Sequence, residues 1–200
     1  MSRFDTAAAD WDKGDLRQHI ARNVAETILK HIPLNDSMDL LDFGAGTGLL
    51  TYNILPHVRS VTAVDTSPKM LEMLQSKSTP EHQVKTACCD ITQMPLSETF
   101  DGIISSMAMH HVEDTSAFLQ TLYDHLNPGG FIAIADLDKE DGNFHSHGND
   151  GVFHFGFERE TLTKLAEQEG FTAISFCTAL TIEKPDRPYP VFLFTAMTKS

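Results

Sequence analysis

Short apolar runs alternate with amphipathic segments along most of the chain. Strand-like runs lie near residues 39–43, 60–64, 84–89, 100–105 and 130–136, and helical patterns lie near 48–55, 68–77 and 114–126. Runs that are apolar throughout are typical of parallel strands covered on both faces. The alternation of strand and helix therefore predicts an α/β fold with a doubly wound, mostly parallel sheet.

The two ends of the chain depart from this alternation. An amphipathic helix is predicted over residues 15–32, where Leu16, Ile20, Val24, Ile28 and Ile32 recur at helical spacing before Pro33. Near the other end, the apolar runs 171–180 and 191–197 leave no room for a helix between them. A parallel crossover needs a dozen or more residues, so we expect this last pair of strands to be antiparallel.

Two further segments complete the predicted pattern. The polar stretch 138–151 is longer than an ordinary connection, and loops of that length tend to be functional. A helix is expected to follow it, with Leu162, Leu165 and Ala166 facing inward and Gly170 beyond its end. For the helix near 114–126, Asp114 is the expected N-cap.

A turn with three glycines follows the first predicted strand. Gly44, Gly46 and Gly48 allow positive φ and close approach of the backbone to a ligand, and the following helix points unpaired N–H groups at the same place. Asp42 precedes this turn and would repel a pyrophosphate but attract a cationic ligand. The spacing G-x-G-x-G also differs from the G-x-G-x-x-G of dinucleotide-binding folds.

Composition narrows the classes of partner. With 15 Lys and Arg against 28 Asp and Glu, the net charge is -13, and the absence of a basic stripe argues against nucleic acid. The three cysteines have neither disulfide nor metal spacing. We expect a cytoplasmic protein without membrane contact, since there is no spanning apolar run and no signal peptide. The oligomeric state stays open.

Five sequence features, in order along residues 38–135, match a known family. They are Asp42-Phe43-Gly44-Ala45-Gly46-Thr47-Gly48, Asp65 at the end of the second strand, Asp90-Ile91 after the third, Phe100–Ser106 as the fourth, and Leu126-Asn127-Pro128-Gly129-Gly130 before the fifth. The first has the form E/D-x-G-x-G-x-G. Together they resemble the class I S-adenosylmethionine-dependent methyltransferases.

The resemblance implies a fold and an activity. The fold is a Rossmann-like, seven-stranded sheet, mostly parallel, with its last strand antiparallel. The cofactor is S-adenosylmethionine, and one domain over residues 1–200 transfers its methyl group. Within it, residues 1–36 hold the N-terminal lid and helix, 37–136 the donor-binding half and 137–200 the acceptor-side half.

The resemblance also implies roles for individual residues on the donor side. Gly44, Ala45 and Gly46 line the methionine end of the cofactor, with Gly48 completing the turn, and Asp42 organises the turn near the ammonium group. Asp65 accepts hydrogen bonds from the ribose hydroxyls beside Thr66. Met70, Asp90 and the Ile91 backbone contact the adenine, Ser106 and Met107 close the site beside the sulfonium, and Trp11 belongs to a lid over the donor.

Acceptor-side residues are harder to predict from the sequence, because methyl transfer is an in-line displacement that needs a base only when the acceptor loses a proton. His110 and His111 are candidate bases, with packing or capping as the alternative, and His154 is a candidate acceptor-pocket residue or an ordinary loop histidine. His145, His147 and His154, near Asp136 and Asp138, lack convincing metal spacing, so no metal is predicted.

Residues 105–112 resemble the small-molecule branch of the family, including quinone-biosynthesis methyltransferases, and differ from the Asn-Pro-Pro-Tyr type of motif. We therefore expect a small-molecule acceptor. Two other hypotheses stay open: a non-catalytic S-adenosylmethionine-binding module or partner subunit, and a nucleotide-dependent oxidoreductase. The oxidoreductase is disfavoured by Asp42 and by the glycine spacing.

Overall fold

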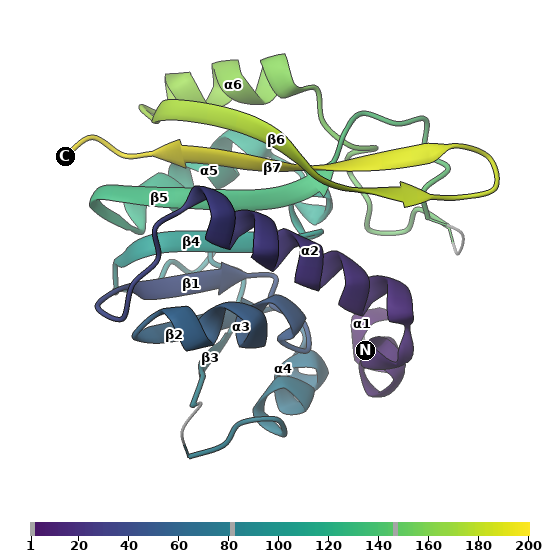
Figure 1. The fold of residues 1–200 in the computed structure, drawn as a ribbon, viewed down its shortest axis with the longest axis horizontal. Helices are drawn as coiled ribbons and strands as arrows, with labels where there is room; N and C mark the ends of the chain where they lie inside the picture. The colour runs from purple at the N-terminus through teal and green to yellow at the C-terminus, as the bar shows by residue number, and fades with distance from the viewer. Residues whose placement is uncertain (1–2, 81–82, 146–147) are drawn as a thin grey trace.

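A computed structural model describes residues 3–80, 83–145 and 148–200. Its strands form one sheet in the order β3-β2-β1-β4-β5-β7-β6 (Figure 1). The strands are β1 Asp39–Phe43, β2 Ser60–Asp65, β3 Lys85–Cys88, β4 Phe100–Ser106, β5 Leu126–Leu137, β6 Thr172–Glu183 and β7 Pro188–Met197. Only β7 runs antiparallel to its neighbours β5 and β6, which confirms the predicted sheet.

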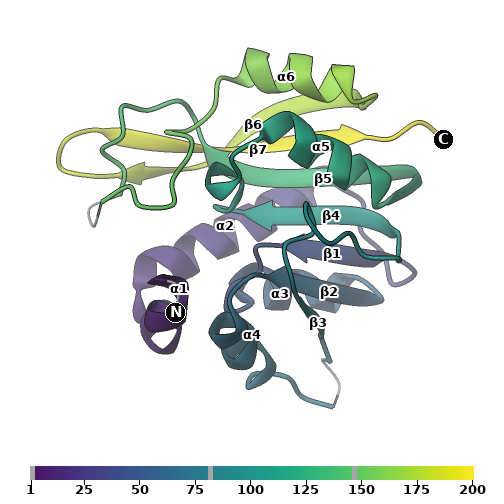
Figure 2. The same ribbon diagram turned by 180° about the vertical axis from the view of Figure 1, so that it is seen from behind.

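Helices cover both faces of this sheet (Figures 1 and 2). The α-helices are α1 Arg3–Ala7, α2 Asp15–His31, α3 Leu49–Ile54, α4 Pro68–Gln75, α5 Thr115–Asp124 and α6 Arg159–Gln168, and the 3-10 helices are η1 Ala8–Lys13, η2 Leu55–His57 and η3 Met109–His111. Apolar side chains of α2, α3 and α4 pack into one core cluster, and those of α5 and α6 into another. The sheet is therefore doubly wound, as the pattern predicted.

The boundary between α5 and β5 differs from the prediction. Asp114 caps α5 as expected, since its side chain accepts a hydrogen bond from Ala117 N at 3.0 Å. However, the helix ends at Asp124 and not near 126. Phe100 N donates to His125 O and Leu126 pairs with Phe100, so this stretch and the following Pro-Gly-Gly segment join the sheet.

Strand β7 also begins earlier than predicted, at Pro188, despite two prolines. Residues 188–190 pair with β6 alone, and pairing with β5 starts at Val191. Proline has no N–H to donate to a ladder and is tolerated at the first residue of a strand or along an edge, and Pro190 O still accepts from Asp138 N at 3.0 Å. The two prolines therefore fit at this end of the strand.

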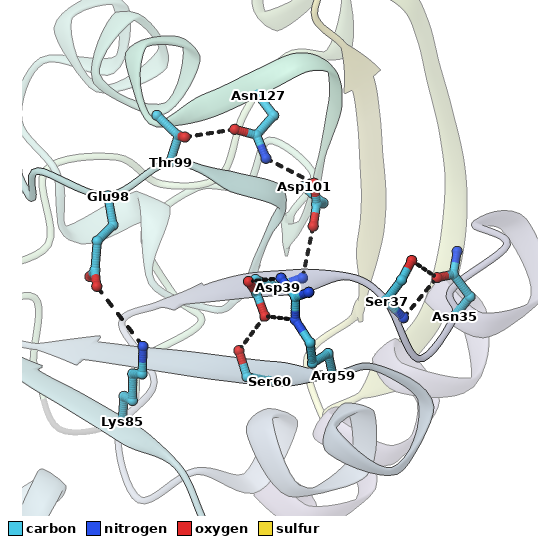
Figure 3. Close-up of polar contacts among 10 residues, drawn as sticks. All are labelled: Asn35, Ser37, Asp39, Arg59, Ser60, Lys85, Glu98, Thr99, Asp101 and Asn127. Atoms are coloured by element: carbon cyan, nitrogen blue, oxygen red, sulfur yellow. Dashed lines mark hydrogen bonds and ion pairs between the residues drawn. The ribbon is translucent and has the colours of Figure 1, made fainter.

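The amino-terminal ends of the parallel strands are joined by a polar network (Figure 3). Asp39, the first residue of β1, accepts hydrogen bonds from Arg59 and from Ser60 Oγ. Asp101 accepts from Asp39 N and from Asn127 Nδ2, both at 2.8 Å. These hydrogen bonds connect β1 with β2 and β4, and β4 with β5, at this edge of the sheet.

The N-terminal segment lies over the opposite, carboxyl-terminal edge, where α1 and η1 form helical turns that the sequence did not predict. The Asp12 carboxylate accepts hydrogen bonds from Thr47 in the glycine turn and from Lys77 beyond α4. In α2, Ile20, Val24 and Ile28 are buried as expected, but Leu16 is 45% exposed. Residues 3–13 therefore form a wall beside the glycine turn.

Candidate active site

The three glycines of the turn after β1 all have positive φ, at 66° for Gly44, 55° for Gly46 and 83° for Gly48. A Cβ on Gly44 would lie 2.4 Å from Cβ of Ala108, and one on Gly48 would lie 2.8 Å from Cγ of Leu74. At Gly46 the nearest atom is Trp11 Nε1 at 3.9 Å. Gly44 and Gly48 are therefore required by packing as well as by φ, whereas at Gly46 a Cβ would meet only an ordinary van der Waals contact and φ alone favours glycine.

A cavity of about 1460 Å³ lies at the carboxyl ends of β1, β2 and β4, where open α/β sheets bind ligands. It brings together most of the predicted site residues: Trp11, Asp42, Gly44, Ala45, Gly46, Asp65, Thr66, Met70, Asp90, Ser106, Met107, His110 and His111. Gly48 and Ile91 do not line it. Gly48 packs on Leu74, and the Ile91 side chain is buried in the core beneath β3 and β4.

Asp42 is almost fully buried at 1% exposure. Its carboxylate accepts a hydrogen bond from Thr51 Oγ1 of α3 at 2.6 Å, and no cationic side chain pairs with it in the described part of the chain. Burial, helped by the nearby Asp65 carboxylate and opposed by the Thr51 hydroxyl, raises the pKa of Asp42 to about 7. A cationic ligand in the cavity would favour the ionised form.

Asp65 is held by the backbone at the end of β2. Its two oxygens accept hydrogen bonds from Gly46 N and Ser67 N, each at 2.8 Å, and so join the glycine turn to the start of α4. Burial raises the pKa of this carboxyl, while those N–H donors oppose the shift. Each oxygen keeps lone pairs that hydroxyl groups of a ligand can use.

The next two strand ends complete the donor side. Asp90 is exposed, and its Oδ1 accepts from Thr92 N and Thr92 Oγ1 in a tight turn after β3. Met107, after β4, has a positive φ of 58°, rare for a residue with a side chain, and its N–H donates to Ala135 O at 2.8 Å. Such backbone strain is typical of functional sites.

Trp11 closes one side of the cavity from η1. The Arg17 guanidinium lies 3.9 Å from the centre of its ring, and the Phe4 ring meets it edge-on at 6.0 Å between centroids. Phe4 in turn contacts the His111 ring at 5.2 Å. The N-terminal wall therefore reaches from the glycine turn to the histidines after β4.

His110 is buried and rigidly held. Its Nδ1 lies 2.8 Å from Asp136 Oδ1, and its backbone N donates to Asp136 Oδ2 at 3.1 Å. Asp136, at 0% exposure, also accepts from Leu137 N. Because a carboxylate only accepts hydrogen bonds, Nδ1 carries the proton, and the other ring nitrogen, Nε2, is left for the cavity.

Two more histidines stand beside His110. The ring centroids of His110 and His111 are 4.1 Å apart, and those of His110 and His145 are 5.2 Å apart. Burial and the neighbouring His110 lower the pKa of both His111 and His145 to about 4. Both rings are therefore neutral at pH 7.

The structure corrects the expectation for His154. Its Nε2 is 2.9 Å from Val112 O and 3.1 Å from Glu113 O, and its ring packs on Phe157. It does not line the cavity, because its polar atom is turned to the backbone before α5. Among the described residues no cluster suits a metal ion, and His147 lies outside them.

Several further residues line the cavity, and of these the sequence had singled out only the long polar loop and its His145. Arg3 and Phe4 come from α1, Phe144 and His145 from the long polar loop, and Lys184 from the tip of the β6–β7 hairpin. Lys184 Nζ donates to Phe144 O and lies 4.3 Å from the centre of the Phe144 ring. No local pattern marked the others, since the hairpin and loop meet only in the folded protein.

The sheet order, the reversed β7 and the glycine turn with carboxylates at the next two strand ends are those of the class I methyltransferase fold. Residues 41–134 match the family described as "Methyltransferase domain". This match, together with relatives and solved structures named as methyltransferases, supports the class I S-adenosylmethionine-dependent methyltransferase family, whose cofactor is S-adenosylmethionine.

Named relatives agree with this family. The chain is 28% identical over 191 residues to a malonyl-[acyl-carrier protein] O-methyltransferase of Acetivibrio thermocellus, covering 86% of this chain and 64% of the relative. An uncharacterized methyltransferase of Schizosaccharomyces pombe is 30% identical over 120 residues, or 55% of this chain and 42% of the relative. The chain spans about half the length of the curated relatives it matches.

Among solved structures, the fold resembles Haemonchus contortus phosphoethanolamine N-methyltransferase 2, in complex with phosphomonomethylethanolamine and S-adenosylhomocysteine. The TM-score is 0.73 at 18% identity, covering 89% of this chain and 53% of that one. No helix in the described ranges is long and apolar enough to cross a membrane.

Proposed function

We propose that this protein transfers the methyl group of S-adenosylmethionine to a small-molecule acceptor. The observation that carries the proposal is that one cavity joins the donor-side carboxylates Asp42 and Asp65 to the histidines after β4. Relatives named for malonyl-[acyl-carrier protein] O-methylation and phosphoethanolamine N-methylation support acceptors with a small reacting group.

On the donor side, the ribose hydroxyls would bind Asp65, whose free lone pairs face the cavity between β1 and β2. Thr66, Met70 and Asp90 would surround the adenine, and Ala45 and Gly46 would contact the methionine end. Asp42 would attract the cationic groups of the donor through the field of its buried carboxylate. Trp11 would cover the donor from the N-terminal wall.

The reaction would be an in-line displacement at the methyl carbon. Ser106 and Met107, at the end of β4, would stand between the donor and the acceptor end of the cavity, so that the methyl group would be directed toward His110. Holding the two reactants in line and excluding water can supply a large part of the rate enhancement in such a step.

Calorimetry and thermal unfolding with S-adenosylmethionine, S-adenosylhomocysteine and NAD test the donor site. The first two ligands should bind and raise the melting temperature, and micromolar affinity corresponds to about 8 kcal/mol. NAD should do neither, because its pyrophosphate would face Asp42. Absence of heat and of stabilisation with both sulfur ligands would overturn the proposal.

Catalysis is tested separately from binding. Candidate acceptors are incubated with S-adenosylmethionine, and formation of S-adenosylhomocysteine is measured. Product formation with a small molecule supports the transferase. Tight donor binding with no transfer to any small acceptor would favour the non-catalytic binding module instead.

A further inference from the structure

We propose that the acceptor is an aromatic hydroxyl compound and that His110, oriented by Asp136, removes its proton. This inference rests on the proposed function and names the substrate class of the same cavity. It follows from the position of one basic nitrogen, from the aromatic walls around it and from the cations at the rim.

The contacts of His110 leave one ring nitrogen, Nε2, free to accept a proton. Asp136 holds Nδ1 at 2.8 Å and also accepts from the backbone N–H at 3.1 Å, so the carboxylate is fixed beside the ring and a turn of the ring would break the Nδ1 contact. Its Nε2 has no hydrogen-bond partner among the described residues, although the side chain is only 2% exposed. A fixed, unpaired ring nitrogen in a cavity is arranged to accept a proton from a ligand.

The neighbouring histidines are poorly suited to that task. Burial and the neighbouring His110, with a smaller contribution from Arg3, lower the pKa of His111 and His145 to about 4, which makes both weak bases. His111 Nδ1 is also occupied by Gly151 O at 2.6 Å. Because the described residues contain no cluster suited to a metal ion, ligation does not explain the free nitrogen of His110.

The walls at this end of the cavity suit a flat, apolar body. Phe4, Phe144 and Phe153 line it together with the neutral His111 and His145 rings. Leu16 and Phe153, which also line the cavity, are 45% and 54% exposed and so offer apolar surface to a ligand. Aromatic rings pack favourably edge-on or offset against such walls.

The charges at the rim favour an acceptor that becomes anionic. Arg3 stacks on Phe4 at 4.8 Å and Lys184 on Phe144 at 4.3 Å, so both cations stand beside the aromatic walls. Their field stabilises a negative oxygen inside the cavity. A hydroxyl on an aromatic ring becomes such an oxygen when it loses its proton.

The proposed step combines a proton transfer to His110 with the transfer of the methyl group to oxygen. The hydroxyl proton moves to His110 Nε2, giving an imidazolium paired with Asp136. An oxygen lone pair forms the bond to the methyl carbon, and the carbon–sulfur bond breaks with its electron pair going to sulfur. The products are a methyl ether, S-adenosylhomocysteine and a proton that His110 later releases to water.

The test uses para-nitrophenol, whose neutral and ionised forms absorb at different wavelengths. The probe is added to the protein saturated with S-adenosylhomocysteine, at a pH where nearly all free probe is neutral. We expect more than half of the bound probe to show the phenolate spectrum. The methyl ether para-nitroanisole, which has no proton to lose, should compete for the same cavity.

His110→Gln should abolish the phenolate signal while still binding S-adenosylhomocysteine. Asp136→Asn should reduce it several-fold, because an amide can donate to Nδ1 and leave the proton on Nε2. His57→Gln, an exposed histidine on η2, serves as the control and should keep the parental signal. Calorimetry with S-adenosylhomocysteine verifies that each variant is folded.

Three results would overturn the inference: no binding of the probe, bound probe that stays neutral, or an unchanged phenolate signal in His110→Gln. Each would leave the donor site intact, since S-adenosylhomocysteine binding is measured in the same samples. Failure of the protein to bind S-adenosylhomocysteine at all would instead count against the proposed function.

Discussion

The two ends of strand β1 carry aspartates three residues apart that experience opposite environments. At the amino-terminal end, hydrogen bonds from Arg59 and Ser60, together with the Arg59 charge, lower the pKa of Asp39 to about 2. At the carboxyl-terminal end, burial raises the pKa of Asp42 to about 7. Asp39 is paired with an arginine and a serine of the protein, whereas Asp42 is buried beside a cavity.

Within this one strand, Asp39 serves the stability of the sheet and Asp42 serves the candidate site. The network around Asp39 connects strands that are already paired (Figure 3), and neither Asp39, Arg59 nor Ser60 lines the cavity. Asp42 lowers stability when it ionises, because a buried charge without a cation is unfavourable. Proteins retain such groups where a ligand supplies the missing partner.

The largest effect is expected for Asp42→Asn. The unfolded chain releases this proton near the ordinary value of 3.8, whereas the folded protein holds it to about 7. Between these values the folded state binds more protons, so stability falls as pH rises, by up to about 4 kcal/mol in total. In urea unfolding, the free energy of unfolding of the variant should therefore rise relative to that of the parent between about pH 4 and about pH 7.

The same variant should bind S-adenosylmethionine more weakly, because a neutral amide does not attract the donor's positive charges. A gain in stability with a loss of affinity would sharpen the contrast between the two ends of β1. If the stability of parent and variant changed with pH in the same way, the contrast would be contradicted, since the pKa of Asp42 in the folded protein would then lie near its ordinary value.

Asp65→Ala should reduce donor affinity by about 1.5–3 kcal/mol, the scale of hydrogen bonds to a charged group. The fold should survive because Asp65 lies at the end of β2 and not within the apolar core. Calorimetry with S-adenosylhomocysteine measures the loss, and Asp36→Ala, an exposed carboxylate before β1, is the charge-matched control. Parental affinity in Asp65→Ala would refute the ribose assignment.

The smallest effect is expected for Asp39→Asn. Its folded pKa is below the unfolded value, so the ion pair contributes stability above about pH 4, and that contribution is lost as pH falls toward 2. Because the pair is partly exposed and screened by solvent, the change at neutral pH should stay below about 1 kcal/mol. Thermal unfolding measures it, and altered donor binding would contradict the separation of the two ends.

The donor half could be predicted from sequence because its signals are local. The strand, the turn and the helix start that hold Asp42, Gly44 and Gly46 are contiguous, and Asp65 ends the next strand. The antiparallel pairing of the last two strands followed from the shortness of the connection between them. Each of these features depends on residues close together in the chain.

The acceptor half could not be predicted in this way. Glu140 accepts hydrogen bonds from Gly142 N, Asn143 N and Phe144 N, and this local fold brings Phe144 toward Lys184. His154 is turned to the carbonyls of Val112 and Glu113 by the path of the same loop. Contacts between distant segments decide these positions, and no periodicity in the sequence encodes them.

The contact between Gly44 and Ala108 links two positions that are far apart in the chain. With a Cβ at residue 44 placed 2.4 Å from that of Ala108, neither side chain can grow while the other keeps its place. During evolutionary divergence the two positions are therefore expected to change together, with residue 108 shrinking first. Gly44 is therefore constrained by the segment after β4 as much as by a ligand.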